Sequence, residues 1–329
     1  MSKKSPKNNF LRSIFVVLTV GFAGCQNQAA RTTFTQGTAE ANENLPRVVA
    51  TTSVLCDLTR QVAGNTVNLT CLIPPTANPK TYKPKPEDRK AIEQANLIFY
   101  TGYNFEPNSI KLIKATKNSA PKIAVAQVAV SKPQRFLQGG RRLTDPHVWH
   151  NTKNAIAMAK VINTNLKKLT PSDAEVYTTN TKKVINQLTQ LDSWIKSTIA
   201  SVPDKQRRLV TTSDAFGYYS KEYGIPLVRG IEGIGSREKL TVERVNDLAK
   251  NIKQAKVPTI FAELAINPNL IQSIATEADV NISERKLYAE GLGEPGSEAD
   301  TYQKMMISNT RTIVEGLGGT YLMFQAKSL

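Results

Sequence analysis

The sequence lacks the motifs that mark several large classes of function. It contains neither a Walker A motif nor a Gly-x-Gly-x-x-Gly run, so no nucleotide- or dinucleotide-binding motif is evident. A His-Glu-x-x-His motif, a nucleophile–base pairing and an oxyanion device are also missing, which disfavours an enzyme. Histidine is scarce, since His147 and His150 are the only two in 329 residues. We expect no enzyme and no organic cofactor, and a zinc hydrolase that uses these two imidazoles with a carboxylate is the less favoured hypothesis.

No apolar run is long enough to cross a bilayer, and the first apolar segment is short. Basic residues, among them Lys3 and Arg12, precede apolar residues 14–23, which is typical of a secretory signal peptide. Phe22-Ala23-Gly24-Cys25 resembles a lipobox, with Phe22 where leucine is typical, and Cys25 would become the lipidated mature N-terminus. We predict a signal peptide over 1–24 and a polar, flexible tether over 25–44. The protein is then exported and lipid-anchored on the periplasmic or extracellular side of the cytoplasmic membrane.

Acidic residues are outnumbered, since 43 Lys and Arg face 27 Asp and Glu and the net charge is +16. Loss of residues 1–24 removes four basic residues and no acids, which leaves +12. A basic chain raises the question of nucleic acid. The lysines are scattered along polar helix faces, however, without an RNP-like, zinc-finger or helix-turn-helix pattern. We therefore expect no nucleic-acid partner, and attraction to an anionic membrane surface instead.

Cysteine is also rare. With Cys25 in the lipobox, only Cys56 and Cys71 remain. In an exported protein these two can pair and close a short loop. The alternative is two small buried residues, one on a helix and one in a strand.

Strand and helix patterns alternate along the body of the chain. Such alternation predicts an α/β protein with parallel sheets that are covered on both faces. Ligands of such sheets bind beyond the carboxyl ends of the strands. The predicted strands cover 47–52, 66–73, 97–101, 123–125, 208–212, 225–228, 259–263 and 286–289. The main predicted helices cover 54–62, 86–95, 155–169, 171–201, 215–222, 242–255, 269–278 and 300–317.

One predicted helix is much longer than the others. It starts with Thr170 as N-cap and Pro171 at the first position, and no breaker follows until Pro203. Apolar residues recur along it at mostly three-four spacing, so it exceeds the usual length of about 11–12 residues. We interpret it as a rigid strut over 171–202, between an N-terminal α/β lobe over 45–170 and a C-terminal α/β lobe over 203–329.

Both histidines lie in Asp145-Pro146-His147-Val148-Trp149-His150, after a basic, glycine-containing loop over 132–144. A neutral imidazole at a loop-to-helix junction is a good ligand for zinc or manganese, and Asp145 can fix its tautomer. The alternative is an ordinary helix N-terminus with Trp149 stacked on it.

Several motifs, in order and spacing, resemble the metal-type solute-binding lipoproteins of ABC importers, the manganese/zinc cluster that includes lipoprotein adhesins. The resemblance runs from about residue 45 to the C-terminus. It implies two α/β lobes joined by one long helix, with the metal in the cleft between them. The matching motifs are Asn78-Pro79-Lys80-Thr81-Tyr82-Lys83-Pro84 with Pro86-Glu87-Asp88, Asp145-Pro146-His147-Val148-Trp149, Asp214-Ala215-Phe216-Gly217-Tyr218 with Tyr223-Gly224, and Asp300-Thr301-Tyr302.

The family takes one metal ligand from each of four loops: His, His, Glu or His, and Asp. At these positions the chain has Lys80, His147, Ser213 and Glu290, so only His147 and a longer carboxylate survive. The family's set carries a charge of −2, whereas this set sums to zero when the lysine is protonated. An ammonium ~4 Å from a divalent ion costs several kcal/mol even at an effective dielectric of ~20. The resemblance therefore implies a degenerate site with weakened or altered metal binding.

Three interpretations of Lys80 remain open. It can pair with Glu290 and replace the ion as the contact between the lobes. It can turn to solvent while His147, Glu290 and water, with Asp214 or His150 as surrogate ligands, hold a weaker metal. It can also lose its proton when buried and act as a ligand itself.

The resemblance implies a monomeric solute-binding protein that delivers manganese or zinc to an ABC permease and its ATPase. With Lys80 in the cleft, the ligand can instead be an anion. The alternative is a scaffold, sensor or adhesin that does not transport, with a metal-free cleft held by Lys80 and Glu290. Asp145, His150 and Asp214 are expected to support the site.

Overall fold

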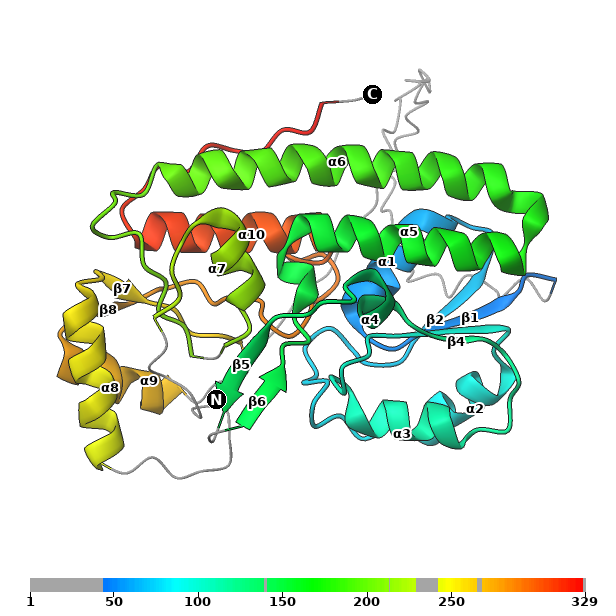
Figure 1. Ribbon diagram of the computed structural model, residues 1–329, viewed down its shortest axis with the longest axis horizontal. Coiled ribbons are helices and arrows are strands. Elements are labelled where there is room, and N and C mark those ends of the chain that lie inside the picture. Colours follow the sequence, from blue (N-terminus) through cyan, green and yellow to red (C-terminus); the bar gives the residue numbers. More distant parts are fainter. Residues whose placement is uncertain (1–43, 139–140, 213, 229–241, 265–267, 328–329) are drawn as a thin grey trace, which may run out of the picture. The chain divides into compact units, whose positions relative to one another are not determined.

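The computed structural model of the chain describes residues 44–138, 141–212, 214–228, 242–264 and 268–327. The predicted signal peptide, Cys25 and nearly all of the tether lie outside these residues. Within them, no helix has both the length and the apolar character needed to cross a membrane. The described body is an α/β fold with parallel strands and one long helix, as predicted (Figure 1).

The first half contains a parallel four-stranded sheet with the strand order β2-β1-β3-β4. Its strands are β1 (Arg47–Ala50), β2 (Asn68–Cys71), β3 (Leu97–Tyr100) and β4 (Lys122–Ala124). Its helices are α1 (Ser53–Ala63), α2 (Pro86–Gln94), α3 (Pro107–Ala115) and α4 (Val125–Ala129). The four strands, α1 and α2 match predicted elements, with ends that differ by a few residues. No range was predicted for α3 or α4, and α4 begins at Val125, which was predicted to end a strand.

Alternate residues of this sheet enter two separate cores, because successive side chains of a strand point to opposite faces. Val48 and Ala50 of β1 belong to a large core that also contains α1 and α5 (Thr152–Leu169). Val49 lies in a smaller core with residues of α2 and α3, among them Ile92. The sheet is therefore covered on both faces, which explains why its central strands β1 and β3 are almost continuously apolar.

The stretch over 132–144 is not the loop that we predicted. It contains an antiparallel hairpin of β5 (Arg135–Gln138) and β6 (Arg141–Thr144). In this ladder Phe136 lies opposite Leu143, and cross-strand apolar pairs of this kind stabilise a hairpin. Several arginines interrupt the apolar pattern in the sequence, so the strands were missed.

The long helix is α6 (Ala174–Ala200), which has 27 residues. A short 3-10 turn over Pro171–Asp173 precedes it, so the predicted start is three residues too early. Thr170 does not act as the N-cap, because its hydroxyl pairs with the Tyr177 hydroxyl at 2.6 Å. The helix packs against α1 and α5 of the first half and against α7 and α10 of the second (Figure 1). It connects the halves as predicted, whereas the lobe boundaries stay a prediction.

The second half is built from shorter parallel pairings. Among the described residues of this half, only β7 (Thr259–Ile260) and β8 (Asn281–Ile282) form a ladder, and β8 was not predicted. The strands predicted at 208–212, 225–228 and 286–289 are reduced to single parallel bridges, since each touches its neighbour at one residue. The helices are α7 (Gly217–Tyr223), α8 (Val242–Ala255), α9 (Pro268–Ala278) and α10 (Tyr302–Gly316).

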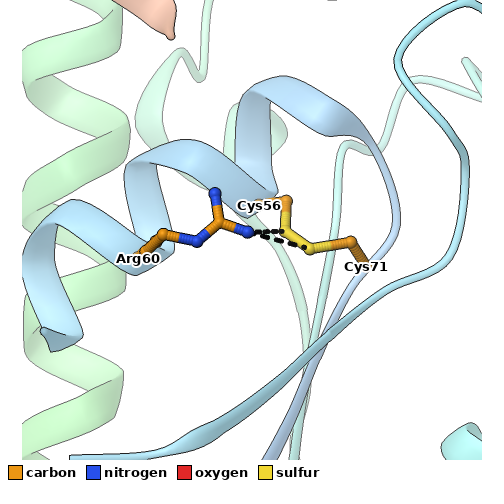
Figure 2. The surroundings of a disulfide bond; sticks show 3 residues. All are labelled: Cys56, Arg60 and Cys71. Carbon is orange, nitrogen blue, oxygen red and sulfur yellow. Dashed lines mark hydrogen bonds between the residues drawn. A yellow bond between two sulfur atoms is a disulfide. The ribbon is translucent and has the colours of Figure 1, made fainter. Parts of the chain in front are cut away.

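A disulfide joins Cys56 of α1 to Cys71 of β2, so of the two alternatives the pairing is correct. The Cα atoms are 5.7 Å apart, within the usual range for a disulfide. Cys56 is buried, whereas Cys71 is exposed at the edge of the sheet. The guanidinium of Arg60, one turn along α1, lies 3.6 Å and 3.7 Å from the two sulfur atoms (Figure 2).

Candidate functional site

His147 lies between β6 and a one-turn 3-10 helix (Val148–His150), and it is 4% exposed. The carboxylate of Asp145 accepts hydrogen bonds from its backbone N–H at 3.0 Å and from its Nδ1 at 2.7 Å. The proton on Nδ1 is thereby fixed, and Nε2 is the nitrogen left for a ligand. The sequence predicted this role for Asp145.

Glu290 is the carboxylate that lies beside the other ring nitrogen of His147. Its Oε1 lies 3.6 Å from Nε2 of His147 and 2.7 Å from Nζ of Lys80. The other oxygen, Oε2, and Nε2 of His147 are both buried without a hydrogen bond to any residue that the structure describes. Buried polar atoms seldom lack a partner in folded proteins, so these two mark a candidate ligand position.

Lys80 reaches this pair from the loop after β2. Its side chain is 43% exposed, whereas that of Glu290 is 16% exposed. The Asn78 side chain accepts a hydrogen bond from the backbone N–H of Lys80 at 2.9 Å, which fixes the turn. Nζ lies 5.9 Å from the ring centre of Phe105, and this ring also makes an edge contact with His147. Lys80 thus forms an ion pair with Glu290, as in the first of its three interpretations.

The charges of the three groups reinforce one another. Burial favours the neutral carboxyl of Glu290, but the positive charges of His147 and Lys80 outweigh it and lower its pKa to about 2. Burial and Lys80 both lower the pKa of His147, yet Glu290 and Asp145 outweigh them, so this pKa is raised above its ordinary value. The result is a compact charged cluster in which the carboxylate is ionised and neutralised from two sides.

His150 lies beside this cluster, and its Nδ1 is buried without a hydrogen bond to any residue that the structure describes. Its Nε2 donates to the backbone carbonyl of Ala289 at 2.8 Å, next to Glu290, and its ring stacks on Phe216 with the centres 4.5 Å apart. Burial lowers the pKa of His150 to about 4, so the ring is neutral. A neutral ring that faces a carbonyl carries its proton on the facing nitrogen. His150 therefore holds the backbone that carries Glu290.

The segment after Glu290 also depends on close packing. A side chain at Gly291 would place its Cβ only 2.6 Å from Oγ of Ser53. The same hydroxyl accepts a hydrogen bond from the backbone N–H of Leu292 at 3.0 Å. Glycine at this position allows the loop to approach α1, and the approach sets the position of Glu290.

The roles predicted for Ser213 and Asp214 stay predictions. Ser213 lies outside the described residues. Asp214 accepts a backbone hydrogen bond from Gly217 at 3.2 Å. Within the described parts of the chain, no group of three or more His, Cys, Asp or Glu residues is placed to hold a metal ion. Among the described residues, the site brings together the imidazole of His147, the carboxylates of Asp145 and Glu290, and the ammonium of Lys80.

Sequence reasoning missed Phe105 and Ser53. Both follow the carboxyl end of a parallel strand, β3 and β1 respectively. Ligands of α/β sheets bind beyond these ends, so their position after the strands was the available signal.

Comparison with known proteins places this geometry in a family. Residues 48–316 match the family described as zinc-uptake complex component A, periplasmic. The metal ABC transporter substrate-binding lipoprotein ScbA of Streptococcus cristatus is 31% identical over 92% of this chain and 97% of its own length. The manganese ABC transporter substrate-binding lipoprotein PsaA of Streptococcus mitis is 32% identical over 82% of this chain and 89% of its own.

Solved structures agree with the sequence relatives. The periplasmic zinc-binding protein TroA from Treponema pallidum aligns with a TM-score of 0.75 and 28% identity, over 83% of this chain and 99% of TroA. A cadmium-bound periplasmic metal-binding protein from Candidatus Liberibacter asiaticus has 23% identity and a TM-score of 0.73, over 82% of this chain and 99% of its own, and so shares the fold. This chain therefore belongs to the zinc-uptake component A family of metal ABC transporter substrate-binding proteins.

Proposed function

We propose that the protein is an exported, lipid-anchored solute-binding protein of an ABC importer whose metal site has been altered by Lys80. The relatives named above are substrate-binding lipoproteins of metal or manganese ABC transporters, which favours a binding role over catalysis. Its partners are then a permease and its ATPase. The chain acts as a monomer and binds its ligand in a cleft, as the family does. The observation that carries the proposal is the ion pair of Lys80 and Glu290 beside His147.

The donors that remain suit a divalent cation in geometry. Zinc bonds to imidazole nitrogen and carboxylate oxygen are about 2.0–2.2 Å long, so two ligands at a tetrahedral angle lie about 3.4 Å apart. Nε2 of His147 and Oε1 of Glu290 are 3.6 Å apart. The pair therefore offers an edge of a metal site, and Asp145 orients the imidazole toward it.

The charge balance opposes tight binding by this pair. With Lys80 protonated, Lys80 and Glu290 cancel, and the neutral His147 imidazole that a metal requires adds no charge to offset a dication. Nε2 of His150 is bonded to the Ala289 carbonyl, and its Nδ1 is buried without a hydrogen bond to any residue that the structure describes. A dication bound to Glu290 has the ammonium of Lys80 beside it, so we infer weak manganese or zinc binding compared with a site of four intact ligands.

Metal content and metal-induced stabilisation of the purified full chain test this function. A ligand present at about 100 times its dissociation constant stabilises a protein by about 2.7 kcal/mol, which a thermal melt detects. We expect no stoichiometric ion and no shift of Tm after chelation or after addition of Mn²⁺ or Zn²⁺. Lys80→His should gain both, whereas Lys90→His, at an exposed position of α2, should gain neither.

A stoichiometric ion in the unmodified chain, with a lower Tm after its removal, would overturn the proposal and restore an ordinary metal importer. A second function is a scaffold, sensor or adhesin that does not transport, and the same ion pair favours it because it closes the site without a metal. Genes for a permease and an ATPase beside the gene for this chain would support delivery over this alternative.

A further inference from the structure

A groove with a volume of about 650 Å³ lies away from the candidate metal site, between the start of α2 and the length of α3. Pockets of about 300–1,000 Å³ are typical of small-ligand sites. Its apolar part includes Pro86 of α2 and Leu112 of α3, and its polar part is basic. The groove is thus large enough for a small molecule, and the charged side chains that line it are all basic.

Four cationic side chains line this groove: Lys83, Lys85, Arg89 and Lys111. All four are exposed residues, and none forms an ion pair with an acidic side chain in the part of the chain that the structure describes. They come from three segments, the loop before α2, α2 itself and α3, so the fold gathers them. In the part of the chain that the structure describes, no ion pair with an acidic side chain offsets the repulsion between these four cations.

The buried Asp88 of α2 forms no ion pair with these four cations in the part of the chain that the structure describes. The carboxylate of Asp88 accepts hydrogen bonds from the Tyr82 hydroxyl at 2.8 Å and from the backbone N–H of Lys85 at 2.8 Å. It therefore stabilises the first turn of α2 and the loop before it. The basic face of the groove is left for an anion from outside, and it repels the divalent metals that the family carries.

The pattern of charge suggests which anion fits. An arginine fork binds phosphate oxygens in a bidentate manner, and lysines add point charges around it. A phosphate monoester carries about −1.5 to −2 at neutral pH and three strong acceptor oxygens, more than a single carboxylate offers. The apolar residues of the groove can contact the organic part of such an ester.

We propose that the groove between α2 and α3 binds a phosphate group attached to an apolar body. Two sources share this chemistry: a soluble phosphate ester and the headgroup of an anionic phospholipid. The proposal does not depend on the altered metal site, since no groove residue belongs to the cluster of Lys80, His147 and Glu290.

The experiment uses the full chain at low ionic strength, because salt screens exposed charges. In the soluble arm, titration calorimetry measures phenyl phosphate, inorganic phosphate and benzoate, which has the same ring with a carboxylate. In the lipid arm, vesicles of phosphatidylglycerol are compared with vesicles of phosphatidylcholine by sedimentation. The Cys25→Ser chain is used in this arm so that acylation does not contribute.

The test variant is Arg89→Glu with Lys111→Glu, which reverses two charges of the groove. The matched control is Lys90→Glu with Lys114→Glu, which makes the same change of charge on the same two helices at exposed positions outside the groove. The test variant should lose phosphate-ligand binding by at least about tenfold, since two charge-assisted contacts are replaced by repulsion. The control should stay within about twofold of the unmodified chain.

Each outcome decides the proposal. Phenyl phosphate binding that exceeds benzoate binding and is lost only in the test variant supports a soluble ester. Binding to phosphatidylglycerol vesicles alone, lost only in the test variant, supports the lipid headgroup. Equal losses in the test and control variants, benzoate binding as tight as phenyl phosphate binding, or no binding in either arm would overturn it. Metal content and Tm of both variants should match those of the unmodified chain.

Discussion

Replacement of Lys80 by methionine is the sharpest test of how the site controls metal binding. Methionine keeps a similar length and removes only the charge. In the protein as it stands, Nζ lies 2.7 Å from Oε1 of Glu290, so an ion bound to that oxygen would have the ammonium beside it. The variant therefore isolates the electrostatic effect of the lysine on a dication.

The magnitude follows from this geometry. A metal–oxygen bond of about 2.1 Å, added to the lysine contact, places the dication within about 5 Å of Nζ. Repulsion between a single and a double positive charge at about 5 Å is about 1.7 kcal/mol in bulk water and about 6.6 kcal/mol at an effective dielectric of 20. Because Lys80 is 43% exposed, the value for water is the relevant one. It corresponds to a gain in affinity of about 15-fold.

The ion pair itself should contribute little to stability without metal. Exposed pairs are worth about 0–1 kcal/mol, so Lys80→Met should unfold at nearly the same urea concentration as the unmodified chain. A gain in metal affinity without a matching change in metal-free stability is the signature that we expect.

The assay is titration calorimetry with Mn²⁺ and with Zn²⁺ on four proteins: the unmodified chain, Lys80→Met, Lys80→Arg and Lys90→Met. Lys80→Arg keeps the charge and should show no gain. Lys90→Met removes a lysine that is outside the site and should also show none. The reasoning is refuted if Lys80→Met binds both ions within a factor of two of the unmodified chain.

Three further predictions concern stability. The pKa of Glu290 is lowered to about 2 from an ordinary 4.5, so its stabilisation is present above pH 4.5 and is lost as the pH falls toward 2. This loss is on the order of 3 kcal/mol. The free energy of urea unfolding of Glu290→Gln should therefore vary less with pH across that range than that of the unmodified chain, and an equal pH dependence of the two proteins would contradict this prediction. His150→Phe leaves the buried Ala289 carbonyl without its donor and should cost about 1–3 kcal/mol, as chemical unfolding would show; unchanged stability would argue against the hydrogen bond. Cys56 and Cys71 are 15 residues apart, so reduction of their disulfide should cost about 3 kcal/mol, and a urea midpoint that a reducing agent does not shift would disprove this.

Local patterns in the sequence were sufficient for several parts of this fold. The apolar spacing from Val184 to Ile195 predicted a long helix, because one face of a helix repeats every three to four residues. The central strands β1 and β3 of the first sheet were predicted since both of their faces are largely buried and apolar. Asp145 beside His147 is a short-range contact, and its role was deduced from spacing alone.

Other features arose from contacts between distant segments. Lys80 and Glu290 are 210 residues apart, and His150 and Ala289 are 139 residues apart. The sequence left three interpretations of Lys80 open, because a flexible lysine is compatible with each of them. Only the packed fold brings its ammonium to the carboxylate.

The sequence by itself determined the class of the protein and the long helix, because propensity, periodicity and motifs are local. The tertiary structure decided which of the motif residues touch. It paired Lys80 with Glu290, turned His150 toward the backbone next to that carboxylate, and gathered the basic residues of α2 and α3 around one groove. These contacts depend on how loops at the ends of strands pack together, which no local pattern encodes.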